Sequence, residues 1–213
     1  MRSMVLRIDG TIPDPAALDQ AAQALSRGEL VVAPTETRYG LLVRADSQEF
    51  IEKLYVLKQR DLHLATALFV RNRNETAKLG RLTETAKILS EQFLPGPLTL
   101  VLQAISDWPP PRVVDGKIGL RCSSAAIIVG LLDRLPMLLT ATSANISGES
   151  DAASVEELAA VFGDRVALYL DAGPLTGTVS TVVDCSVDPV RILREGTISR
   201  ERIRQALGKL NVG

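Results

Sequence analysis

The sequence predicts a single α/β domain, with one twisted, mixed β-sheet flanked by helices. Short apolar runs typical of buried strands alternate along the 213 residues with longer stretches that carry an apolar stripe at helical spacing. Some strands follow one another with no helix between them, which indicates hairpins and therefore a mixed sheet. No break in composition divides the chain, so we expect residues 1–213 to form one domain.

The composition excludes several classes of protein. The formal net charge is −1, from 24 Lys and Arg against 25 Asp and Glu, whereas a protein that coats nucleic acid needs a large basic excess. Cys122 and Cys185 lie far apart in the chain, so we expect small buried side chains rather than a disulfide or a zinc site. No apolar run approaches the roughly 20 residues of a membrane helix. We therefore expect a cytoplasmic protein.

The strands are predicted from short apolar and β-branched runs. In chain order they cover residues 5–8, 30–33, 41–43, 67–70, 98–102, 118–121, the first part of 138–148, 167–170, 180–183 and 190–193. We expect the first of them to be an edge strand. Gly40 is expected to reverse the chain between the second strand and the third.

The helices are predicted from their start and stop signals. They cover residues 15–28 after Asp14 as N-cap, 46–60 after a candidate capping box of Asp46 and Glu49, 83–93 after Thr83, 125–135, 154–163 after a second capping box of Ser154 and Glu157, and 199–210. Glycine closes two of them, at Gly28 and Gly163.

The stretch from Leu138 to Gly148 is the first candidate for a functional site. It changes abruptly from an apolar strand to small hydroxylated residues with one asparagine. Ligands of open α/β sheets bind at such strand ends, and small side chains let a ligand approach the backbone closely. A turn that only caps the strand would have the same composition. Three other polar strand ends, which a sheet could bring to the same edge, favour the functional interpretation.

The usual catalytic motifs are absent. The sequence holds no Gly-x-x-x-x-Gly-Lys phosphate loop, no Gly-x-Gly-x-x-Gly and no Gly-x-Ser-x-Gly, and His63 is its only histidine. What remains is a set of cations and hydroxyl or amide groups at the ends of strands and helices: Thr35, Lys58, Arg60, Arg121, Ser143, Asn145, Ser180 and Arg194. Such groups suit polyanions, above all phosphates. Each cation alone could be a solvated surface charge. Lys58 and Arg60 could also be placed there because cations at the C-terminal end of a helix interact favourably with its dipole.

Six short motifs carry a resemblance to a known family. They are Pro34-Thr35-Glu36-Thr37-x-Tyr39-Gly40-Leu41, Lys58-x-Arg60, Pro95-Gly96-Pro97-Leu98-Thr99-Leu100, Thr142-Ser143-Ala144-Asn145-x-Ser147-Gly148, Ser180-Thr181-Val182-Val183-Asp184 and Leu193-Arg194-Glu195-Gly196. In this order, over about residues 15–205, the chain resembles the YrdC-type threonylcarbamoyl-AMP synthases. It ends where the short form of that family ends, so the extra C-terminal domain of longer relatives is expected to be missing.

The resemblance implies an enzyme that joins L-threonine, bicarbonate and ATP into threonylcarbamoyl-adenylate and releases pyrophosphate. The product would serve the t6A modification at position 37 of certain tRNAs. The implied fold curves around a concave, positively lined cavity. By position, ATP would be bound by Lys58, Arg60, Ser143, Asn145 and Arg194, with Lys58 and Arg60 as catalytic residues, and threonine by Thr35, Arg121 and Ser180. Mg²⁺ is expected to accompany ATP, with no metal ligands predicted in the protein. Possible further partners are tRNA and the downstream threonylcarbamoyl-transferase proteins; no membrane partner is expected.

The chain departs from the family pattern near these sites. The segment 61–66 lacks the proline that usually follows Arg60, Cys122-Ser123 replaces an apolar residue and proline after Arg121, and Arg38 stands where an apolar residue is common. Glu36 is expected to be a solvated carboxylate, or to assist the metal or the amine. Two other interpretations therefore stay open. One is a paralogue of the YciO kind with related nucleotide chemistry, and the other is a non-catalytic RNA-binding module.

Overall fold

The chain folds around one mixed β-sheet, as the sequence predicts. A computed structural model describes residues 3–105 and 107–208. Along the sheet the strands are β1 (Met4–Arg7), β10 (Leu168–Asp171), β2 (Val31–Pro34), β3 (Tyr39–Leu42), β9 (Leu139–Ser143), β4 (Ala67–Phe69), β8 (Lys117–Arg121), β6 (Leu98–Ala104), β11 (Thr181–Asp184) and β12 (Arg191–Arg194); β5 (Gly80–Arg81) pairs with β6, and β7 (Val113–Val114) with β8. The predicted edge strand, β1, lies at one end of this order.

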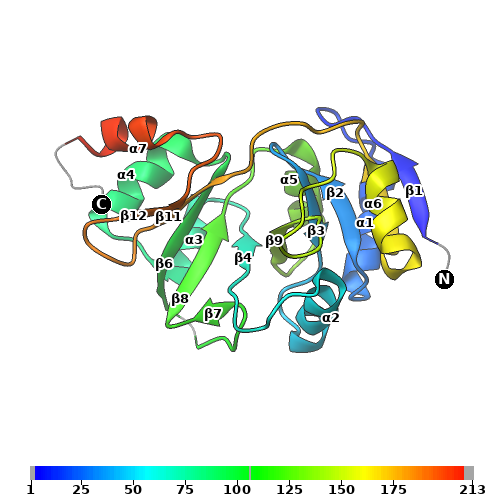
Figure 1. Cartoon of the computed structure of the whole chain (residues 1–213), viewed down its shortest axis with the longest axis horizontal. Helices are drawn as coiled ribbons and strands as arrows, with labels where there is room; N and C mark the ends of the chain where they lie inside the picture. Colours follow the sequence, from blue (N-terminus) through cyan, green and yellow to red (C-terminus); the bar gives the residue numbers. More distant parts are fainter. Residues whose placement is uncertain (1–2, 106, 209–213) are drawn as a thin grey trace.

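The sheet and the helices that pack on it form two halves, which lie side by side in Figure 1. They are α1 (Pro15–Ser26), α2 (Gln48–Lys58), α3 (Arg73–Leu79), α4 (Glu84–Phe93), α5 (Ala126–Arg134), α6 (Val155–Phe162) and α7 (Arg200–Leu207), with a 3₁₀ turn over Gly163–Arg165. In one half, α1 and α5 share an apolar core on one face, and α2 and α6 share another. In the other half, α4 and α7 pack with β6, β8 and β11. No helix of the described ranges is both long and apolar enough to cross a membrane.

Most of the predicted helix starts are confirmed. The side chains of Asp14, Thr83, Ser154 and Ser199 each accept a backbone N–H in the first turn of the helix they precede. The capping box predicted for α2 is wrong. Both carboxylate oxygens of Asp46 are bound by Arg44 at 2.7 Å, so that helix begins one residue later, after Ser47, with no side-chain cap.

The reversal between β2 and β3 differs from the prediction. Gly40 lies inside β3 rather than in the turn. The turn is formed instead by Thr35, whose hydroxyl accepts the N–H groups of Thr37 (3.1 Å) and Arg38 (3.2 Å) and donates to the carbonyl of Arg38 (2.6 Å). A threonine hydroxyl that binds the backbone two and three residues ahead stabilises a turn without glycine.

Several short elements were not predicted: α3, β5 and β7. Asn72 starts α3 by accepting the N–H of Glu75 at 3.0 Å. The last helix ends at Leu207, and residues 209 and 210 of the predicted helix lie outside the described ranges. Cys122 and Cys185 are buried thiols, as predicted, and burial raises the pKa of Cys185 to about 12.

A buried lysine links α2 to the turn that follows β9. The side chain of Lys58 is almost fully enclosed. Its ammonium donates to the carbonyls of Ser143 (2.5 Å) and Asn145 (2.8 Å) and to Oδ1 of Asn145 (3.1 Å). These three acceptors match the three N–H donors of an ammonium group. Burial, reinforced by the nearby charge of Arg60, lowers the pKa of Lys58 from 10.5 to about 8.

This pKa predicts a pH dependence of stability. Between about pH 8 and 10.5 the unfolded chain holds a proton on Lys58 that the folded chain has lost. The free energy of unfolding should therefore rise with pH across this window, by up to about 3 kcal/mol, and the penalty should be fully present below pH 8. In Lys58→Met this rise should be absent. Urea unfolding of both proteins between pH 7 and 10.5 measures it.

The exposed Lys87 of α4 provides the matched control. Lys87→Met removes the same functional group from the surface and should keep the wild-type profile. Parallel pH profiles for wild type and Lys58→Met would contradict the assignment.

Candidate functional site

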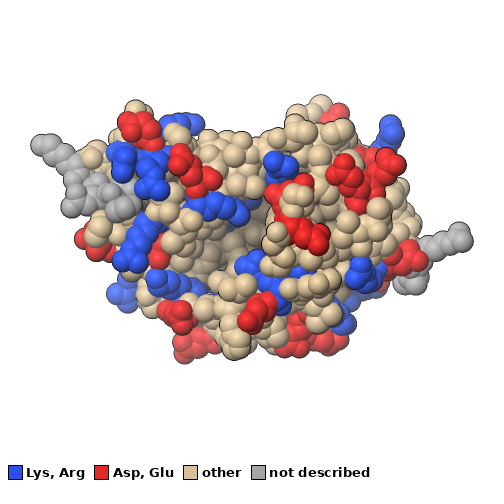
Figure 2. Space-filling view, viewed as in Figure 1, with Lys and Arg blue, Asp and Glu red and all other residues tan. Residues whose placement is uncertain are grey.

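A cavity of about 480 Å³ lies between the two halves of the molecule. Its walls come from the β2–β3 turn, β4, β8, β9, β11 and β12. In Figure 2 the hollow is visible at the centre of the face, with blue basic side chains on both sides of it. Polar strand ends that are distant in the sequence therefore meet at one place.

The wall of this cavity is positively charged. Five cations line it: Arg38, Arg60, Lys117, Arg121 and Arg194. The lining acids are Asp115 and Asp184, and Asp184 is bound by Lys117 at 2.9 Å. The excess of guanidinium groups favours an anionic ligand.

Three of the lining arginines have an unused donor. The Nε atoms of Arg38, Arg60 and Arg121 are buried and have no hydrogen-bond partner among the described residues. Buried N–H groups are rarely left unpaired in native proteins, and an unpaired group suggests a missing ligand or ion. The cavity is therefore a candidate binding site for a polyanion.

Arg121 is held by two residues of the β2–β3 turn, one of which is held in turn by the loop after β8. Its Nη2 atom donates to the hydroxyl of Thr37 at 3.0 Å and lies 3.0 Å from a carboxylate oxygen of Glu36, in an ion pair with poor hydrogen-bond angles. The other oxygen of Glu36 accepts the hydroxyl of Ser123 at 2.5 Å. Glu36, expected to be solvated, is only 13% exposed and neutralises part of the charge of Arg121.

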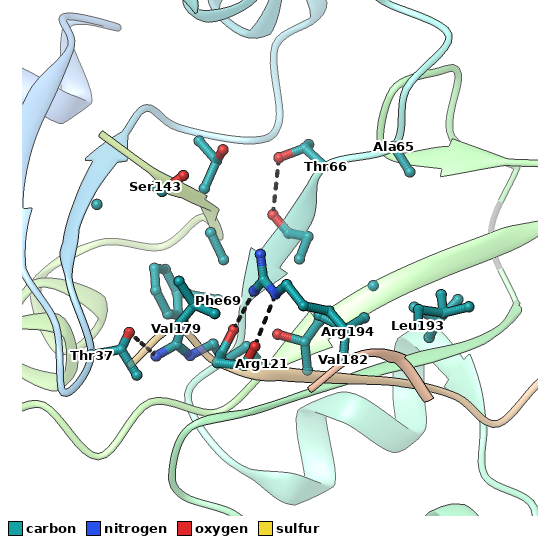
Figure 3. A pocket seen from close by; sticks show the side chains of 18 of the residues that line it. Thr37, Ala65, Thr66, Phe69, Arg121, Ser143, Val179, Val182, Leu193 and Arg194 are labelled. Carbon is teal, nitrogen blue, oxygen red and sulfur yellow. Dashed lines mark hydrogen bonds between the residues drawn. The ribbon is translucent and has the colours of Figure 1, made fainter. Parts of the chain in front are cut away.

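Arg194 reaches into the cavity from β12 and is held by Ser180, the residue that precedes β11 (Figure 3). Its Nε donates to the carbonyl of Ser180 at 3.0 Å, and its Nη2 donates to the hydroxyl of Ser180 at 2.9 Å. Burial, then the nearby charge of Arg121, lowers the pKa of Arg194, and Asp151 opposes this. Two bonds to one residue fix the plane of this guanidinium.

The predicted residues divide into two groups. Those that line the cavity are Thr35, Arg60, Arg121, Ser143, Ser180 and Arg194. Lys58 and Asn145 lie behind Ser143 and are not part of the lining. Oδ1 of Asn145 accepts the hydroxyl of Ser143 at 2.6 Å, while Nδ2 donates to the carbonyl of Glu149 at 2.8 Å. Lys58, Asn145 and Ser143 therefore form one hydrogen-bonded unit, of which Ser143 faces the cavity.

Sequence reasoning missed Lys117 and did not assign Arg38 to the site. Lys117, Gly119 and Arg121 all line the cavity from one face of β8. Alternate residues of a strand share a face, so Lys117 could have been predicted to lie on the same face of the strand as Arg121. Arg38 stood out as a cation at a commonly apolar position, and the sequence alone did not show which way it faces.

Comparison with known proteins finds relatives that cover most of this chain. The threonylcarbamoyl-AMP synthase of Bacillus subtilis is 33% identical over 197 residues, which cover 91% of this chain and 57% of that protein. The structure of Pyrococcus abyssi Sua5 complexed with L-threonine has a TM-score of 0.89 and 28% identity, over 99% of this chain and 63% of that one. The chain thus spans less than two thirds of the length of these two relatives.

Escherichia coli YciO shares the fold. Its crystal structure matches with a TM-score of 0.82 at 23% identity, over 92% of this chain and 96% of that one. A family model named Sua5_yciO_yrdC, described as "Telomere recombination", matches residues 23–196, which include every predicted site residue. The chain belongs to the Sua5/YciO/YrdC family.

Proposed function

We propose that this protein is a threonylcarbamoyl-AMP synthase, an enzyme that condenses L-threonine, bicarbonate and ATP and releases pyrophosphate. The observation that carries the proposal is the single cavity in which Arg60, Arg121 and Arg194 meet the hydroxyls of Thr35, Ser143 and Ser180. Relatives that bear this enzyme's name, and a Sua5 relative solved with L-threonine, support it.

Each side chain has a role in this proposal. Arg60, Ser143 and Arg194 bind the nucleotide phosphates, and Lys58 and Asn145 complete the ATP set by fixing the hydroxyl and carbonyl of Ser143. Thr35, Arg121 and Ser180 form the threonine pocket. Because Thr37 and Glu36 hold Arg121, its unused Nε–H is fixed in place for a carboxylate or carbamate oxygen.

The chemistry needs no protein nucleophile. The amine of threonine takes up bicarbonate with loss of water and becomes a carbamate. A carbamate oxygen then attacks the α-phosphorus of ATP, the bond from that phosphorus to the bridging oxygen breaks, and pyrophosphate leaves. Negative charge grows on the phosphoryl oxygens, and cations held in place beforehand stabilise it. Of the two predicted catalytic residues, we assign this charge stabilisation to Arg60, which lines the cavity, whereas Lys58 contributes by holding Ser143 in position.

Mg²⁺ fits this scheme as part of the nucleotide substrate. The described residues contain no group of three or more His, Cys, Asp or Glu side chains placed to hold a metal. Mg²⁺ is commonly bound through substrate phosphates with few protein ligands, so the MgATP complex suits this cavity.

As a nucleotidyltransferase of this kind, the protein would act in the cytoplasm, and its product would pass to the threonylcarbamoyl-transferase proteins that modify tRNA.

The proposal predicts that pyrophosphate release depends on threonine. With MgATP and bicarbonate present, L-threonine should stimulate release, and L-serine should do so less, because it lacks the methyl group of the natural side chain. A coupled pyrophosphate assay, with no amino acid as the background, measures this.

Release that is indifferent to the amino acid would contradict the proposal and favour a paralogue with other nucleotide chemistry. Binding of tRNA that weakens steeply with salt, in a protein that releases no pyrophosphate, would favour the RNA-binding module.

The ATP site predicts the behaviour of two variants. Arg60→Ala should lower ATP affinity at least tenfold, because it removes a charge-assisted donor. Lys58→Met should lower it as well, because the carbonyl of Ser143 loses its donor and Asn145, which accepts the hydroxyl of Ser143, loses one of its own. Isothermal titration calorimetry measures both. Unchanged ATP affinity in both variants would remove these residues from the site.

A further inference from the structure

The side chain of Arg38 lies at the cavity without a partner among the residues that the structure describes. It lines the cavity, and among the described residues it makes no hydrogen bond or ion pair through its side chain. The other lining cations are each held: Arg60 by the carbonyl of Ala65, Lys117 by Asp184, Arg121 by Thr37 and Glu36, and Arg194 by Ser180. A guanidinium whose buried Nε–H has no partner carries a desolvation cost that an anionic ligand would remove.

The backbone of Arg38 is fixed, so its position is not that of a loose surface loop. Its N–H donates to the hydroxyl of Thr35 at 3.2 Å, and its carbonyl accepts both the N–H (3.1 Å) and the hydroxyl (2.6 Å) of Thr35. Immediately after it, Tyr39 begins β3. The turn and the strand together fix the position of the Arg38 backbone, from which its side chain extends.

The register of the sheet places Arg38 beside the nucleotide end of the cavity. Gly40 pairs with Ser143, and the N–H of Ala144 donates to the carbonyl of Tyr39 at 2.9 Å. Arg38, two residues before Gly40, and Ser143 both line the cavity. Opposite residues of an antiparallel pair project to the same face, and Gly40 places no side chain between Arg38 and Ser143.

We propose that Arg38 is an additional phosphate-binding residue, which contacts a phosphate group of the nucleotide next to Ser143. This rests on the proposed function for the identity of the nucleotide.

Calorimetric titration of the whole protein with ATP tests the proposal. Arg38→Met keeps the length of the side chain and removes its charge, and it should weaken ATP binding about tenfold or more. Arg38→Lys keeps the charge without the fork of donors and should lose less. Affinity for L-threonine without nucleotide should equal that of wild type in both variants.

Arg204→Met, which removes an exposed arginine of α7, is the control for the change in net charge and should bind ATP like wild type. Thermal unfolding confirms that each variant is folded. Equal ATP affinity in wild type and Arg38→Met would overturn the proposal, and so would a loss confined to L-threonine.

The outcome is separable from that of the proposed function. If ATP binding depends on Arg38 but the wild-type protein shows no threonine-dependent release of pyrophosphate, this inference holds and the proposed enzymatic function is contradicted. Threonine-dependent release with ATP affinity independent of Arg38 would do the reverse. A wild-type protein that binds no ATP would overturn both.

Discussion

The pairing of β9 with strands on both sides is the constraint on which the rest of the structure depends. β9 lies antiparallel to β3 on one edge and to β4 on the other, and so joins the two halves of the sheet. The hydroxyl of the fully buried Thr140 accepts the N–H of Val43 at 3.1 Å and donates to the carbonyl of Leu41 at 3.3 Å, which ties β9 to β3 by a side chain as well as by the backbone. Because β9 ends at Ser143, the seam between the halves is also the floor of the cavity. Any slip of this register would move Ser143 away from the cations that face it.

The cost of burying Lys58 makes sense in this context. An ammonium group taken out of water is unfavourable unless its donors are satisfied, and here two carbonyls and one amide oxygen of a single short turn satisfy them. The turn gains a fixed shape in return. Asn145 uses the same oxygen for Lys58 and for the hydroxyl of Ser143, so the position of that hydroxyl at the end of β9 depends on a residue of α2. The lowered pKa of Lys58 reflects the price of this rigidity.

The fold could largely be predicted from the sequence, because its signals are local. Apolar runs located the long strands, and capping side chains such as Thr83 and Ser154 located the helix starts. The errors also have local causes. Asp46 looked like a cap but is bound by Arg44, and the two-residue strands β5 and β7 carry too few residues to show a period. The site was harder. The family resemblance assigned Thr35, Arg121 and Arg194 to one site, but the ion pair of Glu36 with Arg121 depends on residues more than eighty positions apart, and the direction of Arg38 depends on the sheet register.

The loop after β8 shows how the chain can depart from the family pattern and keep its cavity. Where the family usually has a proline, Ser123 is only 2% exposed; its hydroxyl donates to Glu36 at 2.5 Å and accepts the N–H of Ala125 at 3.2 Å. Ala125 is the N-cap position of α5 and has no capping side chain of its own, so Ser123 supplies a hydrogen bond there. A proline would hold this loop through its ring, whereas Ser123 holds it through two hydrogen bonds, one of which also fixes the carboxylate beside Arg121. In this chain, hydrogen bonds of Ser123 therefore support the loop beside Arg121, in place of the rigid ring of a proline. The geometry of Arg121 therefore depends on Ser123, which holds the carboxylate of Glu36, as well as on Glu36 itself.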